Sequence, residues 1–416
     1  MAINNAADAS VRSRDLDNAV KEIERWLIHS MLGDVLLTDI FSKFSQKIDK
    51  SLFPLLRSHM TMRQMHPFID NTDHTWHRTG ELSTSSRPRT LIAEPNWTQS
   101  PLFHMLANTL PEYRCDLTRP DVVERYPIFS KFAEDGGTDY IAFLSPFGNE
   151  ENALKQQDGI IASWLTDQQG GFTEEEIAAL RRLVSLFFVA ARIFKREQTL
   201  HDVLSAYLGP AAAHQIMEGK HQRGDGDVIQ AVIWICDLRG SSALADQLEM
   251  PAYLALLNQF FESMAEAVMA EGGEVLKFMG DGFLAIFPTM DGTAISDAAQ
   301  RALNAARKGA EALANQPSDA AKLKFGIGIH HGDVMFGNIG ARERLDFSVI
   351  GPAVNMASRL QDLTKKLNVK LLVSSSVADQ VTIDWRRFPP QSVSGLKNPI
   401  EVLTPAWPEI ISDHNP

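Results

Sequence analysis

Cysteine is scarce in this sequence: only Cys115 and Cys236 occur among its 416 residues. So few cysteines imply no disulfide framework, which fits a protein that folds in a reducing cytoplasm. Cys236 lies within an apolar run, where a small buried side chain is expected rather than a redox thiol. Basic residues are outnumbered, with 40 Lys and Arg against 52 Asp and Glu and a formal net charge of −12. This balance disfavours nucleic acid as a partner but allows a local cationic pocket for a nucleotide.

Long hydrophobic runs are also absent. Residues 1–14 are polar and small and lack the apolar core of a signal peptide. The most apolar helical stretch, residues 183–194, contains Ser185 and Arg192 and is too short and too polar to span a bilayer. We therefore expect a soluble cytoplasmic protein with no membrane partner. Its length allows two or three domains of about 150 residues each.

Apolar periodicity and turn signals divide the chain into five segments. They are an N-terminal helical segment (1–44), a sensory domain (45–195), a helical transducer and hinge (196–225), a second α+β domain (226–405) and a tail (406–416). Gly33 is the expected break between two helices of the first segment. In the sensory domain we expect strands at 58–69, 138–147 and 156–165, and a loop at 80–90.

A capped helix is expected to close the sensory domain. Thr173 and Glu176 have the spacing of a capping box, in which each side chain accepts a hydrogen bond from a free backbone N–H group. The preceding strand, the Asp-Gln-Gln-Gly-Gly-Phe turn and this helix resemble the close of a GAF-type sensor domain. The resemblance covers residues 45–195 without a diagnostic motif. It implies an α/β domain that dimerises or binds an unknown small-molecule effector.

Two features of the first half leave alternatives open. The sensory domain is rich in histidine and methionine, which favours either a haem or metal site or, more commonly, hydrogen-bonded core and surface residues. These residues are His59, His66, His74, His77, His104, Met60, Met62 and Met65. The capped helix carries apolar residues at alternating spacings of three and four, namely Ile177, Leu180, Val184, Phe187, Ala191 and Phe194. This stripe predicts either a parallel dimer helix of the coiled-coil type or an amphipathic helix packed on its own domain.

Two acidic residues in the second half mark a candidate site. Residues 274–287 predict two apolar strands joined by the turn Gly280-Asp281-Gly282, with the carboxylate at the tip. Upstream, the apolar run 228–236 ends in Asp237, followed by a small-residue loop and a helical pattern. This order is typical of a phosphate and divalent-ion site, because loop N–H groups attract anions and a hard cation binds carboxylate oxygens. The loop residues are Leu238, Gly240, Ser241 and Ser242.

The order of elements from residue 228 onward is strand, helix, hairpin, helix, strand, which is the ferredoxin-like β-α-β-β-α-β arrangement. It would place Asp237 and Asp281 on adjacent central strands. Beyond it, a helix starting near Pro352 carries Asn355 and Arg359 on one face. The glycines of residues 326–332 are expected to allow close packing of a central strand, and His330 and His331 to be packing residues.

Residues from about 226 to 402 resemble the catalytic domain of class III nucleotidyl cyclases. The resemblance rests on four stretches in the family's order: the Asp237 strand and loop, residues 277–281, residues 326–334 and residues 348–359. It implies an adenylate cyclase that converts ATP to 3′,5′-cyclic AMP and pyrophosphate, under the control of the sensory domain. Two Mg²⁺ or Mn²⁺ ions per active site would be held by Asp237 and Asp281, with the Leu238 carbonyl as an extra ligand.

The resemblance also assigns the remaining site residues. Arg359 would stabilise charge on the α-phosphoryl group, Asn355 would position the ribose, and Lys397 would contact the triphosphate. Lys277 and Ser348 would read the base: Lys277 only donates, which suits adenine N1, and the Ser348 hydroxyl accepts from the adenine amino group. Serine at position 348 is shared with a bacterial branch that often responds to bicarbonate, which makes bicarbonate activation a hypothesis.

In this family one subunit supplies the metal aspartates and the other the purine and transition-state residues. The resemblance therefore implies a head-to-tail homodimer with two shared sites. Alternatives are a guanylate cyclase and a catalytically silent nucleotide-binding scaffold. A diguanylate cyclase is disfavoured, because this chain has Met279-Gly280-Asp281-Gly282-Phe283 in place of Gly-Gly-Asp/Glu-Glu-Phe.

Overall fold

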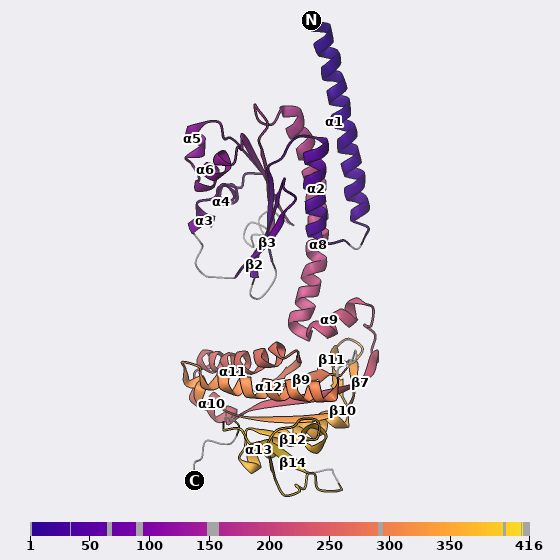
Figure 1. The fold of residues 1–416 in the computed structure, drawn as a ribbon, viewed down its shortest axis with the longest axis vertical. Helices are drawn as coiled ribbons and strands as arrows, with labels where there is room; N and C mark the ends of the chain where they lie inside the picture. Colours follow the sequence, from indigo (N-terminus) through magenta and orange to yellow (C-terminus); the bar gives the residue numbers. More distant parts are fainter. Residues whose placement is uncertain are drawn as a thin grey trace. The chain divides into compact units, whose positions relative to one another are not determined.

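The structure is a computed structural model that describes residues 2–33, 35–64, 69–88, 95–147, 158–289, 294–393, 397–408 and 410. It divides into two compact units, Met1–Val203 and Leu204–Pro416, which we describe separately. Among the described residues, no helix has both the length and the apolar character needed to cross a membrane. Figure 1 labels most of the helices and several strands of both units.

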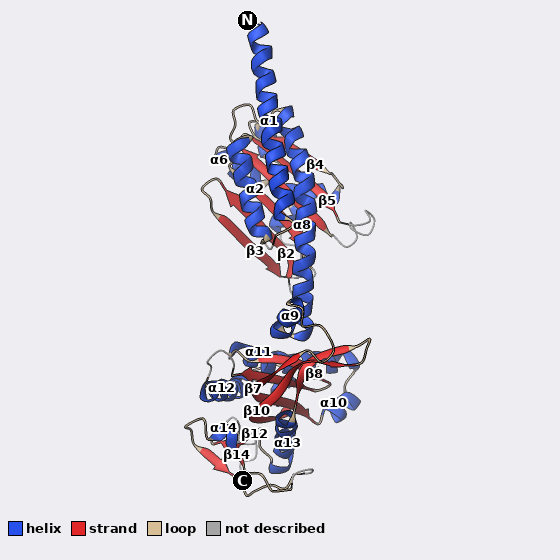
Figure 2. Cartoon of the chain, turned by 90° about the vertical axis from the view of Figure 1, so that its right-hand side faces the viewer, coloured by secondary structure: helices blue, strands red, loops and turns tan. Residues whose placement is uncertain are grey.

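The N-terminal unit is built on a six-stranded antiparallel sheet of order β3-β2-β1-β6-β5-β4. Its strands are β1 (Arg57–Arg63), β2 (Ile69–His77), β3 (Leu82–Pro88), β4 (Glu112–Asp116), β5 (Asp139–Pro146) and β6 (Gly159–Thr166). Its helices are α1 (Ala2–Ser30), α2 (Leu37–Ser51), α3 (Pro95–Thr98), α4 (Pro101–Ala107), α5 (Pro120–Val123), α6 (Pro127–Glu134) and α8 (Glu174–Leu208). Helices α1, α2 and α8 cover one face and the shorter helices the other (Figures 1 and 2). Each face has its own apolar core, because alternate residues of β6 point to opposite sides.

The predicted strands of this unit are found as β1, β5 and β6, whereas the loop expected at residues 80–90 is wrong. Residues 82–88 form β3, which pairs only with β2 at the edge of the sheet. Its serines and threonines are exposed, and an edge strand tolerates such polar residues because one side faces solvent. Strands β2 and β4 were not predicted, since they lack the apolar alternation of a half-buried strand.

The helix α8 begins at the predicted capping box. The backbone N–H of Thr173 donates to the Glu176 carboxylate at 2.8 Å, and that of Glu176 donates to the Thr173 hydroxyl at 3.2 Å. The predicted apolar stripe from Ile177 to Phe194 is buried in the core of the unit itself. The structure therefore matches the alternative of an amphipathic helix packed on its own domain, and the dimer-helix prediction for this stripe is not confirmed. The helix runs on to Leu208 and ends at Gly209, which has a φ of 91°.

The C-terminal unit has the predicted strand and helix order. Its strands are β7 (Gly226–Arg239), β8 (Glu274–Met279), β9 (Gly282–Pro288), β10 (Lys324–Gly340), β11 (Leu345–Ile350), β12 (Leu371–Ser374), β13 (Trp385–Arg387) and β14 (Val402–Pro405). Its helices are α9 (Pro210–Met217), α10 (Ser241–Gln247), α11 (Met250–Ala270), α12 (Ile295–Ala314), η1 (Asp319–Lys322), α13 (Pro352–Leu367) and α14 (Ser375–Ala378). The central strand order β10-β7-β9-β8 is that of a ferredoxin-like β-α-β-β-α-β unit. Cys236 is buried in its core, as predicted.

Helices α11 and α12 cover one face of this sheet and α13 the other (Figure 2). Glycines of β10 let α13 approach closely: a Cβ at Gly328 would overlap the Ala357 carbonyl, and one at Gly332 would lie 2.9 Å from the Ala353 Cβ. The predicted role of these glycines in close packing is thus confirmed. The contact matters for the site, because α13 carries Asn355 and Arg359.

We predict that Gly328→Ala lowers the free energy of unfolding by about 1–3 kcal/mol, because the added methyl group must push α13 away from the sheet. Urea unfolding of the full chain, followed by tryptophan fluorescence, measures the change. Gly33→Ala is the matched control, since its new Cβ would meet its nearest neighbour at 3.6 Å. Equal stability of the two variants would contradict the close approach of α13.

Candidate functional site

Asp237 and Asp281 lie side by side at one end of the C-terminal sheet. Asp237 is the third residue from the end of β7 and pairs with Gly282, the first residue of β9. The backbone N–H of Leu238 donates to the Asp281 carbonyl at 3.1 Å, which ties the hairpin tip to β7. A side chain at position 282 would collide with Asp237, whose Oδ1 lies 2.6 Å from the position of such a Cβ. Glycine at this position therefore makes room for the carboxylate.

The turn that presents Asp281 is tighter than predicted. Met279 pairs with Gly282, so that Gly280 and Asp281 alone form a two-residue loop between β8 and β9. Gly280 has a φ of 69°, the left-handed conformation that two-residue hairpin loops require at their first position and that glycine adopts most readily. The loop leaves Asp281 a short reach to β7, which fixes its position beside Asp237.

The electrostatics of this pair favour a cation. Burial, together with the negative charges of Asp281 and Asp362, raises the pKa of Asp237 to about 6. Among the described residues, no group of three or more His, Cys, Asp or Glu is placed to enclose a metal ion. Two carboxylates without further protein ligands suit Mg²⁺, which is commonly bound by one or two carboxylates together with waters and substrate phosphates.

An ion pair joins β8, which carries Lys277, to β11, which carries Ser348. The ammonium of Lys277 on β8 pairs with the carboxylate of Asp346 on β11. Asp346 and Ser348 are two residues apart and share the partly exposed face of β11, while Phe347 and Val349 are buried. The three polar side chains therefore line one exposed strip, with an amine, a carboxylate and a hydroxyl.

Asn355 and Arg359 lie one turn apart on α13, as predicted. Asn355 is exposed and Arg359 is partly exposed, and within the part of the chain that the structure describes Arg359 forms no ion pair. Asp362 follows Arg359 by one turn, and its charge acts on Asp237. Helix α13 thus extends alongside the sheet from the Asn355 turn to the carboxylate pair.

The other predicted site residues are more scattered. Gly240, with a φ of 74°, precedes the short helix α10, so the N–H groups of Ser241 and Ser242 open its first turn just after Asp237. Lys397 is exposed, and the structure shows no contact between it and the other candidate residues within the described parts. The match in this region rests on little more than the lysine itself, and its neighbours Gly395 and Leu396 lie outside the described residues.

Sequence reasoning missed two residues of the site, Asp346 and Asp362. Asp362 was detectable, because it lies seven residues after Asn355 and three after Arg359, on the same side of a predicted helix. Asp346 gave no comparable signal, since its importance depends on a long-range pairing of β11 with β10 and on the ion pair to Lys277.

The histidines of both units are held by local hydrogen bonds. His59 and His74 bond through Nδ1 to Thr75 and Thr84, each at 2.9 Å, whereas His66 and Met65 lie outside the described residues. His330 bonds through Nδ1 to the Ser374 hydroxyl at 2.8 Å, and burial lowers its pKa to about 4. These contacts match the hydrogen-bonded alternative for the histidines, and His330 is a packing residue, as predicted.

Comparison with known proteins places the second domain in a family. Residues 228–400 match the model of the adenylate and guanylate cyclase catalytic domain. An adenylate cyclase of Anabaena cylindrica is 31% identical over 157 residues, which cover 37% of this chain and 31% of that protein. An uncharacterized protein of Mycobacterium tuberculosis is 32% identical over 215 residues, or 52% of this chain and 38% of that protein. The chain therefore spans well under half the length of these curated relatives.

Among solved structures, a bacterial light-regulated adenylyl cyclase is 20% identical, with a TM-score of 0.46, and the match covers 62% of this chain and 83% of that one. A guanylyl cyclase structure is 28% identical, with a TM-score of 0.37, and the match covers 43% of this chain and 92% of that one.

We predict that Asp237→Asn stabilises the metal-free protein at pH 8. The folded pKa of about 6 lies above the ordinary value of 3.8, so the stability linked to this proton is present at low pH and is lost as pH rises through 6. Removing the ionised carboxylate should raise Tm by about 2–4 °C at pH 8, and the difference should close as pH falls below 6. The measurement is thermal unfolding in EDTA.

Asp333→Asn is the control for this prediction, because it removes an exposed carboxylate from β10 away from the pair. It should leave Tm unchanged at both pH values. A lower Tm of Asp237→Asn at pH 8 would contradict the repulsion between the two carboxylates.

Proposed function

Because residues 228–400 belong to the adenylate and guanylate cyclase catalytic domain family, we propose that this protein is an adenylate cyclase that converts ATP to 3′,5′-cyclic AMP and pyrophosphate. The observation that carries the proposal is the pair of facing carboxylates at the ends of β7 and the β8–β9 hairpin. Similarity to an adenylate cyclase of Anabaena cylindrica supports the same activity.

Asp237 and Asp281 would hold two Mg²⁺ or Mn²⁺ ions, with the Leu238 carbonyl as an additional oxygen ligand. The donor set fits, because it consists of oxygen atoms and the pair repels itself when no cation is bound. When bound, the ions supply Lewis acidity: they favour ionisation of the ribose 3′-hydroxyl and neutralise the phosphates. The protein contributes the fixed separation of the two carboxylates through the Leu238 N–H bond to the Asp281 carbonyl.

Other residues would bind and orient the triphosphate and ribose. Arg359 would donate from its guanidinium to the α-phosphoryl oxygens as charge builds up on them, and Asn355, one turn earlier, would orient the ribose. The N–H groups at Ser241 and Ser242, after Gly240, would face phosphate oxygens. Lys397 would add a further cation to the triphosphate, which its exposed position permits.

The polar strip of Lys277, Asp346 and Ser348 supports ATP as the substrate. The Lys277 ammonium can donate to adenine N1, and the Asp346 carboxylate and the Ser348 hydroxyl can accept from the adenine amino group. Guanine has a donor at N1 in place of the acceptor of adenine, and the Lys277 ammonium, which only donates, cannot pair with it. A guanylate cyclase is the second candidate, and a nucleotide-binding scaffold without activity is the third.

We also propose that the active unit is a head-to-tail homodimer. Lys277 and Asp281 are four residues apart in one hairpin, yet Lys277 contacts β11 whereas Asp281 lies against β7. The base-reading and metal-binding groups of one chain therefore face different neighbours. Large hydrophobic side chains are exposed around the strip, which supports a covered surface. They are Phe278, Met279, Leu345 and Ile350.

A second exposed stripe supports pairing of two chains through α8. Val189, Ile193 and Leu200 are exposed on a face of α8 that is not the buried one, and the partly exposed Val203 follows them, at spacings of four, seven and three. Such spacing is that of a heptad seam. This stripe differs from the predicted one, which the core of the unit occupies.

Regulation by the N-terminal unit is part of the proposal, with α9 as the connecting element. The backbone N–H of Ala211 at the start of α9 donates to the Glu274 carboxylate on β8 at 2.9 Å. Ala212 is buried against the sheet beneath it. A displacement of α9 would therefore act on the strand that carries Lys277. A cyclase assay with and without bicarbonate measures its effect, and comparison with a chain that lacks the N-terminal unit shows whether this unit activates or inhibits.

We predict that the purified full chain forms cyclic AMP from ATP with Mn²⁺, and that Asp281→Ala and Arg359→Ala each lower the rate by about 100-fold or more. Mixing the two inactive variants should restore about a quarter of the wild-type rate, because half of the dimers then hold one intact site of two. Chromatographic quantification of cyclic AMP is the measurement.

Arg307→Ala, on the exposed face of α12, is the matched control and should keep the wild-type rate. If the wild-type protein formed no cyclic AMP, the result would favour the third candidate, a nucleotide-binding scaffold without activity. Active single variants, or a mixture that stays inactive, would refute the shared site.

We predict that Lys277→Glu combined with Ser348→Cys shifts the preference from ATP toward GTP by about tenfold or more in kcat/KM, since the new groups match the donors and acceptors of guanine. Competition between ATP and GTP in one reaction measures the ratio. Lys308→Glu is the control: it also breaks an exposed lysine–carboxylate pair, with Glu271, but lies on α12. An unchanged ratio would exclude the strip as the base-reading site.

A further inference from the structure

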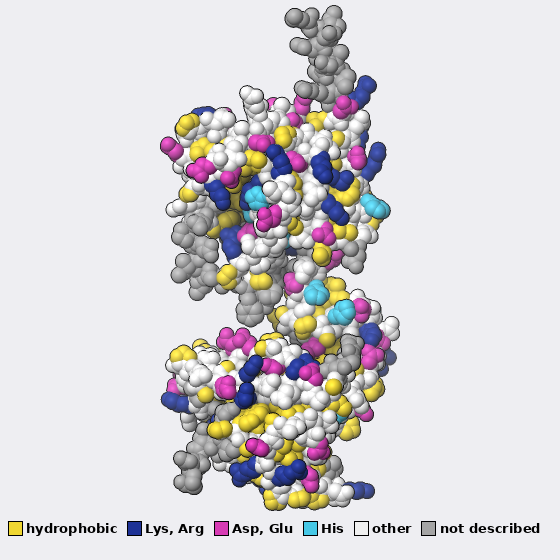
Figure 3. Space-filling model, viewed as in Figure 1, with side chains coloured by type: hydrophobic (Ala, Val, Ile, Leu, Met, Phe, Trp, Pro, Cys, Tyr) yellow, Lys and Arg dark blue, Asp and Glu magenta, His cyan; other side chains and the backbone are white. Residues whose placement is uncertain are grey.

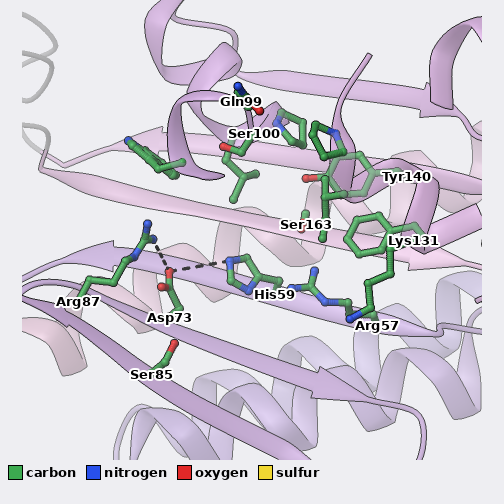
Figure 4. Close-up of a pocket in the computed structure, with 16 residues that line it drawn as sticks. Arg57, His59, Asp73, Ser85, Arg87, Gln99, Ser100, Lys131, Tyr140 and Ser163 are labelled. Carbon is green, nitrogen blue, oxygen red and sulfur yellow. Dashed lines mark hydrogen bonds and ion pairs between the residues drawn. The ribbon is translucent and has the colours of Figure 1, made fainter. Parts of the chain in front are cut away.

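The N-terminal unit contains a cavity of ≈ 540 Å³ between its sheet and the shorter helices on the second face. Strands β1, β2 and β3 supply charged residues, and the α3–α4 region and α6 supply much of the apolar wall (Figure 4). The volume lies within the range of about 300–1,000 Å³ that is usual for small-molecule sites. All of its lining residues belong to this one unit.

Arg57 places an unpaired cation in this cavity. Burial lowers the pKa of its guanidinium to about 10. Its hydrogen bond to the Thr75 hydroxyl is long, at 3.4 Å, and within the described residues no carboxylate lies within ion-pair distance. The guanidinium stacks on the ring of Phe132, with 5.2 Å between its Cζ atom and the ring centroid. A cation withdrawn from water without a counter-charge is costly to the folded state, so the site favours an anion.

Asp73, the one carboxylate among the described residues of the lining, is already engaged. Asp73 pairs with Arg87 at 3.0 Å, and its Oδ1 lies 4.0 Å from His59 Nε2. Arg87 in turn keeps a buried Nε atom without a hydrogen-bond partner. Burial lowers the pKa of His59 well below its ordinary value, and the charges of Arg57 and Arg87 lower it further, so the imidazole stays neutral.

Lys131 adds a third cation from α6. Figure 4 shows its side chain extending toward Arg57, and both charges act on nearby His77. Among the described residues, the lining thus holds three cations, Arg57, Arg87 and Lys131, against one carboxylate, an excess of two positive charges. Two neighbouring cations repel each other, and an anion bound between them offsets this repulsion.

The remaining wall is aromatic and aliphatic. Trp97 lies under the Arg87 guanidinium, 5.2 Å from its Cζ atom to the ring centroid, and Leu102 and Tyr140 complete this side. A ring could pack on these side chains, while inorganic phosphate alone would leave them uncovered.

We propose that this cavity binds a small organic anion, a ring-bearing carboxylate or phosphate whose charged group lies between Arg57 and Lys131. The ring of the ligand packs against Trp97 and Phe132. The inference rests on contacts within the N-terminal unit and does not depend on cyclase activity. The proposed ligand of the sensory domain therefore belongs to the class of small organic anions.

The test is isothermal titration of the full chain with phenyl phosphate, benzoate and, as the neutral counterpart, phenol. We expect saturable binding of at least one anion with a Kd of about 1 mM or below, and no binding of phenol in that range. The stronger of the two anions distinguishes a phosphate site from a carboxylate site. Arg57→Gln and Lys131→Gln should each weaken it about tenfold.

Arg119→Gln is the matched control, because it removes an exposed arginine that does not line the cavity and should leave the Kd unchanged. Lys131 is exposed, so Lys131→Gln tests the site even if loss of the buried Arg57 impairs folding. The proposal is overturned if neither anion binds, if phenol binds equally well, or if Lys131→Gln binds with wild-type affinity.

Discussion

Repulsion between Asp237 and Asp281 is the constraint that the catalytic unit is built to withstand. Asp237 carries this cost on top of its burial: burial first and the charge of Asp281 second raise its pKa. The chain keeps the two residues together with backbone contacts: β7 pairs with β9 up to Gly282, and the Leu238 N–H group holds the Asp281 carbonyl. Because these are main-chain bonds, the carboxylate oxygens remain available to a cation. The ferredoxin-like order, which places β9 beside β7, supplies the geometry.

The local features of this fold could be predicted from the sequence because they depend on interactions between residues that are close together in the chain. The capping box of α8 and the Gly280-Asp281 turn involve atoms within four residues of each other, and both are found where they were predicted. The strand and helix order of the second domain followed from hydrophobic period alone. The two predicted acids are therefore brought together, as expected from the placement of β7 and the hairpin.

Features that depend on contacts between residues far apart in the chain could not be predicted from the sequence. The stripe from Ile177 to Phe194 has heptad spacing, but spacing cannot tell whether the covering surface is another chain or the domain's own core, and here it is the core. The sequence of β3 was predicted to be a loop, because this exposed edge strand lacks alternating apolar residues. The charged cavity also escaped prediction, since Arg57, Arg87 and Lys131 meet only once three strands and a helix have packed.

Strand β8 connects the functions that the site requires. At one end Glu274 accepts a hydrogen bond from α9, in its middle Lys277 pairs with β11, and its end leads through Gly280 to Asp281. These contacts lie within eight residues of one short element, so a shift of β8 cannot move one group without moving the others. The strand has few buried residues of its own, and such elements move at low cost. A signal that displaces α9 would therefore reach the proposed base-reading and metal-binding residues together.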